Sequence, residues 1–157
     1  MASRLPPFPR FIFTVFEPIS LLSGFLPAVF LTDWFISEQI PINVPVQSTE
    51  NSRLVAQQLG NCYGLAFLIS MAVLYTSTEL PVVRNYLKAL WLADIGHILL
   101  TYKTLHREGF LSIATWNAMT WGNIGVTLFL CMTRTAYLLG LFGPDSPSAS
   151  TTPRKHW

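Results

Sequence analysis

Long apolar runs separated by short polar stretches dominate the sequence. About 20 apolar residues in a helix span the roughly 30 Å hydrocarbon core of a bilayer. Four windows meet this length, at about residues 11–31, 55–75, 86–105 and 113–132. The pattern predicts an all-α fold, a polytopic membrane protein built as a four-helix transmembrane bundle.

The windows differ in how many polar residues they contain. The first has Glu17 as its single formal charge, whereas the third holds Lys88, Asp94, His97 and Lys103. The fourth has no formal charge, and the second is polar in its first two turns. Hydropathy therefore supports the third span least.

Proline, glycine and polar residues mark the predicted connections. Residues 37–52 suit an exposed loop, and Pro81 in the 76–84 stretch should stop helix continuation. Gly109 fits the end of the third helix. The predicted domains are an N-terminal segment over 1–10, the transmembrane domain over 11–143, and a disordered, Pro/Ser/Thr-rich tail over 144–157.

Basic residues are distributed unequally between the two sides that four spans define. The side holding both termini carries seven and the other side three, so the positive-inside rule places both termini in the cytosol. The charge bias fixes sidedness alone, and the endoplasmic reticulum is the expected membrane. The first apolar run exceeds the 7–15 residues of a signal peptide and no A-x-A-like site follows it, so we expect a retained helix. The two groups are Arg4, Arg10, Arg84, Lys88, Arg134, Arg154 and Lys155, against Arg53, Lys103 and Arg107.

Composition supports a membrane protein and excludes several other classes. Of the 157 residues, 51% are hydrophobic and 11% are charged, whereas an ordinary soluble domain has about 25% charged residues. A soluble enzyme and a disordered chain are therefore both disfavoured. A net charge of +2 gives no basic patch for nucleic acid. Cys62 and Cys131 lack metal-ligand spacing, and no cofactor motif is present, so no metal and no cofactor is implied.

Ionisable residues at membrane depth are the candidate catalytic groups, because a charge there is costly and usually faces a cavity or a partner. Asp94 and His97 lie three residues apart on one helix face. They are either a carboxylate–imidazole pair that joins helices or a proton donor and acceptor. Glu17, next to the helix-breaking Pro18, is a third candidate. Its alternative role is an ion pair with Arg84, Lys88 or Arg134.

Amides and indoles supply the candidate substrate-binding residues. Trp116, Thr120 and Asn123 follow helical spacing on one face, with Asn117 and Trp121 on the adjacent face. They suit a pocket that hydrogen-bonds an oxygen and stabilises a cation; the alternatives are interfacial anchoring and helix packing through Gly122 and Gly125. In the second helix, Gln57 and Asn61 either line the same pocket or face water. The candidate set is Asn117, Trp121, Asn123, Trp116, Asn61 and Gln57.

Several short motifs carry a resemblance. They are PRF at 9–11, FEP at 16–18, DWF at 33–35, ADIGH at 93–97, WN at 116–117 and WGN at 121–123. Over residues 9–140 the chain resembles a family of small fungal integral membrane proteins with four helices and a domain of unknown function, some encoded in secondary-metabolite gene clusters. It is more distantly similar, in residue types rather than spacing, to the emopamil-binding and sterol-isomerase group. That group places His, carboxylates, Asn and Trp around an intramembrane cavity and shifts a double bond by protonation and deprotonation.

Two functions follow as expectations. The first is a cofactor-free acid/base isomerase or cyclase acting on a lipophilic isoprenoid, sterol-like or polyketide intermediate of fungal secondary metabolism. Asp94 or Glu17 would donate a proton, His97 would orient or accept it, and the tryptophans would stabilise positive charge. The alternative is a non-catalytic protein that binds, shuttles or scaffolds such intermediates. The expected partners are the lipid bilayer, a lipophilic small molecule and other membrane biosynthetic enzymes.

Overall fold

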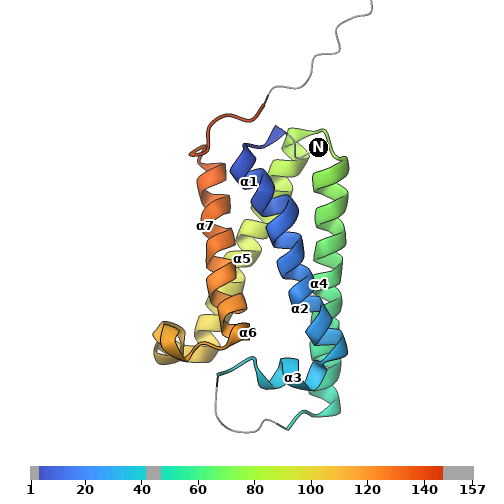
Figure 1. Ribbon diagram of the computed structural model, residues 1–157, viewed down its shortest axis with the longest axis vertical. Helices are drawn as coiled ribbons and strands as arrows, with labels where there is room; N and C mark the ends of the chain where they lie inside the picture. The colour runs from blue at the N-terminus through green and yellow to red at the C-terminus, as the bar shows by residue number, and fades with distance from the viewer. Residues whose placement is uncertain (1–3, 42–46, 147–157) are drawn as a thin grey trace, which may run out of the picture.

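The computed structural model describes residues 4–41 and 47–146, and within these ranges every element of regular secondary structure is a helix. The helical elements form four long stretches, which run side by side along the long axis of the molecule (Figure 1). The first stretch is continuous through α1 (Pro7–Phe11), the π-helix η2 (Ile12–Phe16) and α2 (Glu17–Phe30). The predicted all-α fold is therefore confirmed for the described residues.

The remaining elements complete the bundle. The described ends of the chain lie at one end of it, and α3 and α6 lie at the other (Figure 1). The bounds are α3 (Thr32–Ser37), α4 (Glu50–Thr76), α5 (Leu80–Leu111), the 3-10 helix η3 (Ile113–Thr115), α6 (Ala118–Thr120), the π-helix η4 (Trp121–Val126) and α7 (Thr127–Leu138).

Two helices are long and apolar enough to cross a membrane. They are Pro7–Phe30, with a mean hydropathy of 1.6, and Glu50–Thr76, with a mean hydropathy of 1.5. The protein buries only 28% and 17% of their most apolar windows. Both helices therefore present most of their apolar surface to the surroundings.

Close packing of α2 on α4 depends on glycine. A Cβ atom at Gly60 would lie 2.8 Å from Val29 Cγ2 and 2.9 Å from Ala28 Cβ. Real Cβ atoms essentially never come this close to a neighbour. Gly60 therefore lets the two backbones approach, as small residues do between membrane helices.

The helix starts differ from the predicted ones because of local capping. The second long helix begins at Glu50 instead of 55, since Thr49 and Ser52 form a capping box. The third begins at Leu80 instead of 86, and Pro81 occupies its first turn, where a missing N–H costs nothing. The second helix ends at Thr76, before Pro81, as predicted, but Pro81 lies in the first turn of the third helix and not in the connection.

The third helix also ends later than predicted. It continues past 105 to Leu111, with a kink at His106, where φ is 54°. The predicted junction over 106–109 thus coincides with an interruption of helical geometry and not with the end of the element.

The fourth long helical stretch lies further along the chain than predicted. It was predicted over 113–132, but continuous helix runs from Ala118 to Leu138. Asn117 is its N-cap, and the Asn117 side chain accepts a hydrogen bond from the Thr120 N–H. The shift places Arg134 inside the helix and leaves Trp116 outside it.

A short helix that the sequence pattern did not predict, α3, turns the chain between the first two long helices. Asp33 on α3 accepts from Arg53 Nε on α4 at 2.7 Å, and Ser48 also donates to this carboxylate. The hydrogen bond from Arg53, followed by the one from Ser48, lowers the pKa of Asp33. This contact fixes α3 against the start of α4.

Residues 144–146, at the start of the predicted disordered tail, contact the bundle. Ser146 N donates to Arg4 O at 2.8 Å, and Arg84 contacts Asp145 Oδ2 at 2.6 Å. Tyr137 also donates to the Asp145 carboxylate. These contacts join residues 144–146 to the end of the bundle, while 147–157 lie outside the described residues.

Candidate functional site: a buried carboxylate–guanidinium cluster

The Arg134 side chain is buried at the centre of the bundle, with a relative exposure of 0%. Its Nη2 donates to Glu17 Oε1 on α2, and its Nη1 donates to Asp94 Oδ2 on α5. The guanidinium carbon lies 5.4 Å from the ring centroid of Phe13, which adds a cation–π contact. One cation from α7 thus holds two carboxylates from two other helices.

The chain around Glu17 is locally adapted to this role. Glu17 follows the π-helix η2 and precedes Pro18, which has no N–H to donate within the helix. The carbonyl of Thr14, four residues before Pro18, accepts the Tyr75 hydroxyl of α4 at 2.7 Å instead. π-Helical segments are rare and are frequently found at functional sites.

Four polar atoms beside Arg134 are buried and make no well-formed hydrogen bond among the described residues. They come from four helices; the Tyr86 and Ser70 hydroxyls face each other as a weak pair, and Tyr86 lies within electrostatic reach of Glu17 and Arg134. An unpaired buried polar atom costs about 1–3 kcal/mol. The four atoms are Glu17 Oε2, Ser70 Oγ, Tyr86 OH and Arg134 Nε.

Formal charge at the cluster does not balance. Glu17 and Asp94 supply two negative charges against the single positive charge of Arg134. A net charge in a dry interior is expensive, and the usual relief is proton uptake or a bound partner. Together with the unpaired atoms, this makes the cluster a site that can bind a proton or a polar group.

His97 lies apart from the cluster. Its polar neighbour is Asn123 on η4, and its buried Nε2 makes no well-formed hydrogen bond among the described residues. Asn123 Nδ2 in turn donates to Gln39 Oε1, just after α3, at 3.3 Å. Among the described residues, Asp94 binds Arg134 and His97 lies beside Asn123, so the Asp94–His97 pair, one of the two interpretations offered above, is not formed.

The candidate binding residues near the start of the fourth long helical stretch each have their own structural contacts. Asn117 caps the helix and donates to Glu38 O at 2.9 Å. Trp116 donates to Gly109 O at 3.2 Å, and its ring meets Trp121 edge-on at 5.0 Å between centroids. Trp121 is 49% exposed, so it does not line a buried pocket with the others.

Gln57 and Asn61 lie on the exposed surface of α4. The structure therefore brings together Glu17 and Asp94, places His97 with Asn123, and leaves these two amides and Trp121 at the surface. Among the described residues, no group of three or more His, Cys, Asp or Glu side chains could hold a metal ion.

Sequence reasoning missed Arg134, Tyr86 and Ser70 as site residues. Arg134 was placed at the cytosolic boundary because the fourth span was ended at 132, although it was named as one possible partner of Glu17. Of the three basic residues considered for Glu17, the structure selects Arg134. The sequence did offer a signal: if the fourth helix is continued to Leu138, as in the structure, Arg134 becomes a basic residue within it.

Comparison with known proteins identifies a family and no characterised relative. A family model described as "Domain of unknown function (DUF7704)" matches residues 2–144. No curated protein matches the chain, and no solved structure does. Because the match covers nearly the whole chain, the protein belongs to this family, the domain of unknown function DUF7704.

Proposed function

We propose that the protein is an integral membrane protein of four spans and that its buried cluster performs cofactor-free acid/base chemistry on a lipophilic substrate. The main observation behind this proposal is that Glu17 and Asp94 both form ion pairs with Arg134 inside an apolar bundle, with unpaired polar atoms around them. Such groups are costly in a membrane interior and usually serve a function there.

The outer surface supports the membrane assignment. Large apolar side chains are exposed on every long helical stretch, which a water-soluble protein of this size would rarely tolerate. In a bilayer the same surface contacts lipid. Examples are Phe30 at 70% exposure, Val55 at 69%, Leu68 at 63%, Leu100 at 67% and Met132 at 62%.

The length of the other two helices is consistent with four spans. α5 is uninterrupted from Leu80 to the kink at His106, which corresponds to about 39 Å of helix. The helix over 118–138 is also long enough for the roughly 30 Å hydrocarbon core. The described chain ends lie together, as an even number of spans requires (Figure 1).

Glu17 is the best-placed acid. One of its oxygens accepts from Arg134, whereas Oε2 is free to hold a proton. In the proposed reaction, the Glu17 Oε2 proton adds to an alkene carbon of the substrate and leaves a carbocation beside the Asp94 carboxylate. Loss of a proton from the neighbouring carbon to Glu17 restores the acid and moves the double bond. Protons and electrons balance without a cofactor.

A non-catalytic role is the second candidate. Glu17 and Asp94 each already bind Arg134 through one oxygen, and this arrangement also suits a cluster that joins helices and hydrogen-bonds the polar group of a carried molecule. If the role is non-catalytic, substitution of either carboxylate should weaken binding of the lipophilic molecule, and that molecule should leave the protein chemically unchanged.

Metabolite analysis of the native host separates the two functions. Glu17→Gln and Asp94→Asn keep side-chain volume and remove the acid, and Glu108→Gln at an exposed position is the matched control. For a catalyst, we expect a precursor to accumulate with both cluster variants, at normal levels of membrane-inserted protein, and not with the control. Unchanged product profiles in all three variants would refute the catalytic proposal.

A further inference from the structure

The hydroxyl groups of Ser70 and Tyr86 are buried polar groups that the proposed reaction does not use. Ser70 on α4 has a relative exposure of 0%, and Tyr86 on α5 has a half-buried side chain whose hydroxyl is fully buried. The two hydroxyls face each other as a weak pair, and neither makes a well-formed hydrogen bond among the described residues. Two hydrogen-bond donors therefore meet at one buried point.

These hydroxyls lie across the seam between two helix pairs. α2 packs closely on α4, and α5 packs closely on α7, whereas α4 and α5 contact each other at few points. The cluster spans the same two pairs, because Glu17 lies on α2 while Asp94 and Arg134 lie on α5 and α7. Low contact density marks the parts of a protein that open most easily, so this seam is where a ligand can enter.

The unpaired atoms at the cluster are mainly hydrogen-bond donors. Arg134 Nε–H can only donate, and the two hydroxyls can each donate one hydrogen. Glu17 Oε2 accepts when the carboxylate is ionised, and it becomes a further donor when it holds the proton that the proposed reaction requires. A ligand group that only accepts hydrogen bonds therefore satisfies the largest number of these atoms.

Charge decides which acceptor fits the cluster. A carboxylate or phosphate would add negative charge where Arg134 already binds two carboxylates. An ammonium group brings donors alone, and a hydroxyl brings one donor of its own. A carbonyl oxygen is neutral, accepts two hydrogen bonds and donates none.

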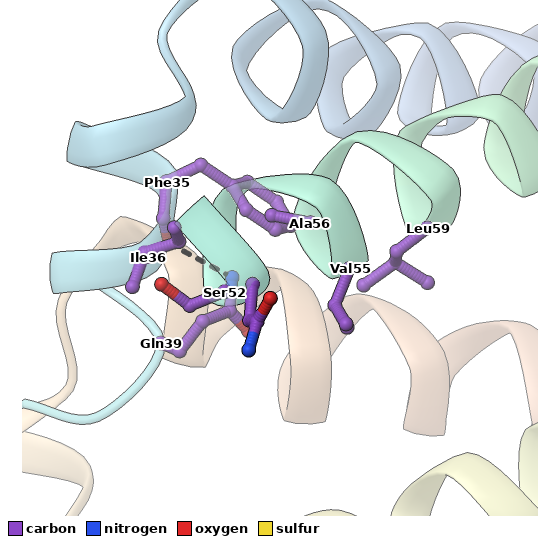
Figure 2. A pocket seen from close by; sticks show the side chains of 8 residues that line it. Phe35, Ile36, Gln39, Ser52, Val55, Ala56 and Leu59 are labelled. Carbon is purple, nitrogen blue, oxygen red and sulfur yellow. Dashed lines mark hydrogen bonds between the residues drawn. The ribbon is translucent and has the colours of Figure 1, made fainter. Parts of the chain in front are cut away.

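The apolar groove between α3 and the first turns of α4 has no comparable set of donors (Figure 2). Its Gln39 amide bonds to Phe35 O and to Asn123, and Ser52 belongs to the cap of α4. Most of the remaining lining is apolar. The polar group of a ligand is therefore better held by the two buried hydroxyls.

We propose that Ser70 and Tyr86 bind the carbonyl oxygen of a lipophilic ketone, each by donating its hydroxyl hydrogen. The apolar body of the ketone lies beside Phe16 and Val73, which pack with Tyr86 against the same apolar core. The site rests on the proposed function in one respect, that the lipophilic molecule is held at the cluster. It applies to a catalyst and to a carrier alike.

Infrared difference spectroscopy tests the site directly. The full chain is placed in nanodiscs of ether-linked phosphatidylcholine, which has no carbonyl group, and is loaded with hexadecan-2-one or cholest-4-en-3-one. Subtracting spectra of the ¹³C-carbonyl ketone from those of the ¹²C ketone isolates the ligand band. Hydrogen bonds weaken the C=O bond, so we expect a second band at lower wavenumber than in protein-free nanodiscs. Absence of this band with both ketones would overturn the proposal.

Matched variants assign the band to the two hydroxyls. Tyr86→Phe and Ser70→Ala each remove one donor, so each should move the bound band toward that of the free ketone and reduce the bound fraction several-fold. Tyr102→Phe, on the exposed surface of α5, is the control and should change neither. An unchanged bound band in both hydroxyl variants would refute the assignment.

Stability measurements separate a binding role from a structural one. Both hydroxyls lack a well-formed bond among the described residues, so Ser70→Ala and Tyr86→Phe should leave the unfolding midpoint unchanged or raise it. A lower midpoint in both variants would show that the hydroxyls support the fold and would contradict the proposal.

Two further outcomes separate the ketone site from catalysis and from other ligands. Hexadecan-2-one has no alkene, so its binding reports the hydroxyl pair alone: a shifted band with unchanged metabolites in Glu17→Gln would keep the site and remove the catalyst, and a missing band with accumulated precursor would do the reverse. Hexadecan-2-ol should displace the ketone several-fold less well than unlabelled ketone does. Equal displacement would contradict the choice of a carbonyl.

Discussion

Arg134 is the single side chain on which we expect the bundle to depend most. It is wholly buried and binds a carboxylate on each of two other helices. Removing one partner of a buried ion pair leaves an uncompensated charge and usually costs about 3–5 kcal/mol. Replacing all members of such a cluster by uncharged residues often changes the free energy of unfolding very little.

Arg134→Met should therefore destabilise the protein by about 3–5 kcal/mol, measured by equilibrium unfolding in mixed detergent micelles. Combining it with Glu17→Gln and Asp94→Asn should recover most of that loss, because no unpaired charge remains. A single variant as stable as the wild type, or a triple variant as unstable as the single one, would contradict this prediction.

Tyr75 compensates for Pro18 through one hydrogen bond. Tyr75→Phe removes the bond to the Thr14 carbonyl, and we expect it to cost about 0.5–1.5 kcal/mol. Adding Pro18→Ala supplies a backbone N–H for that carbonyl, so the Tyr75 effect should shrink in the double-mutant cycle. Tyr102→Phe on exposed α5 surface is the control. Strict additivity of the two substitutions would contradict the coupling.

At the scale of elements, the α2–α4 pair depends on a close backbone approach. Gly60→Ala should destabilise the protein, because its Cβ would overlap Ala28 and Val29 and overpacking costs about 1–3 kcal/mol. Gly96→Ala on α5 has no atom within 4 Å of the new Cβ and should be neutral or stabilising by up to about 1 kcal/mol. Equal effects of the two substitutions on unfolding would argue against tight α2–α4 packing.

At the scale of the whole molecule, the proposed four spans would fix which connections share a side of the membrane. We expect a cysteine at Thr78, between α4 and α5, and one at Gln47, before α4, to react with a membrane-impermeant maleimide from opposite sides of sealed vesicles. Both positions are exposed. A variant without Cys62 and Cys131 supplies the background. Reaction of both positions from the same side would contradict the four-span topology.

Much of the architecture could be predicted from the chain. Apolar runs of sufficient length are a local property, so the four long helical stretches and their even number were readable from hydropathy. The helix ends were harder to predict from hydropathy. Capping by Thr49 and Asn117 sets the starts of two helices, and a proline in the first turn marks the start of a third. α3 was missed because six residues give too short a periodic signal.

The sequence by itself determined that the chain is apolar and helical and that Glu17 and Asp94 are the carboxylates within its predicted spans. Tertiary structure decided what those carboxylates meet. Arg134 lies 117 residues from Glu17 and 40 from Asp94 along the chain, so no local pattern could pair them. The groove between α3 and α4 likewise depends on how the two helices pack. The physical reason is that the free energy of burying a charged side chain depends on the residue itself. The ion pair that offsets this free energy depends on which helices pack together.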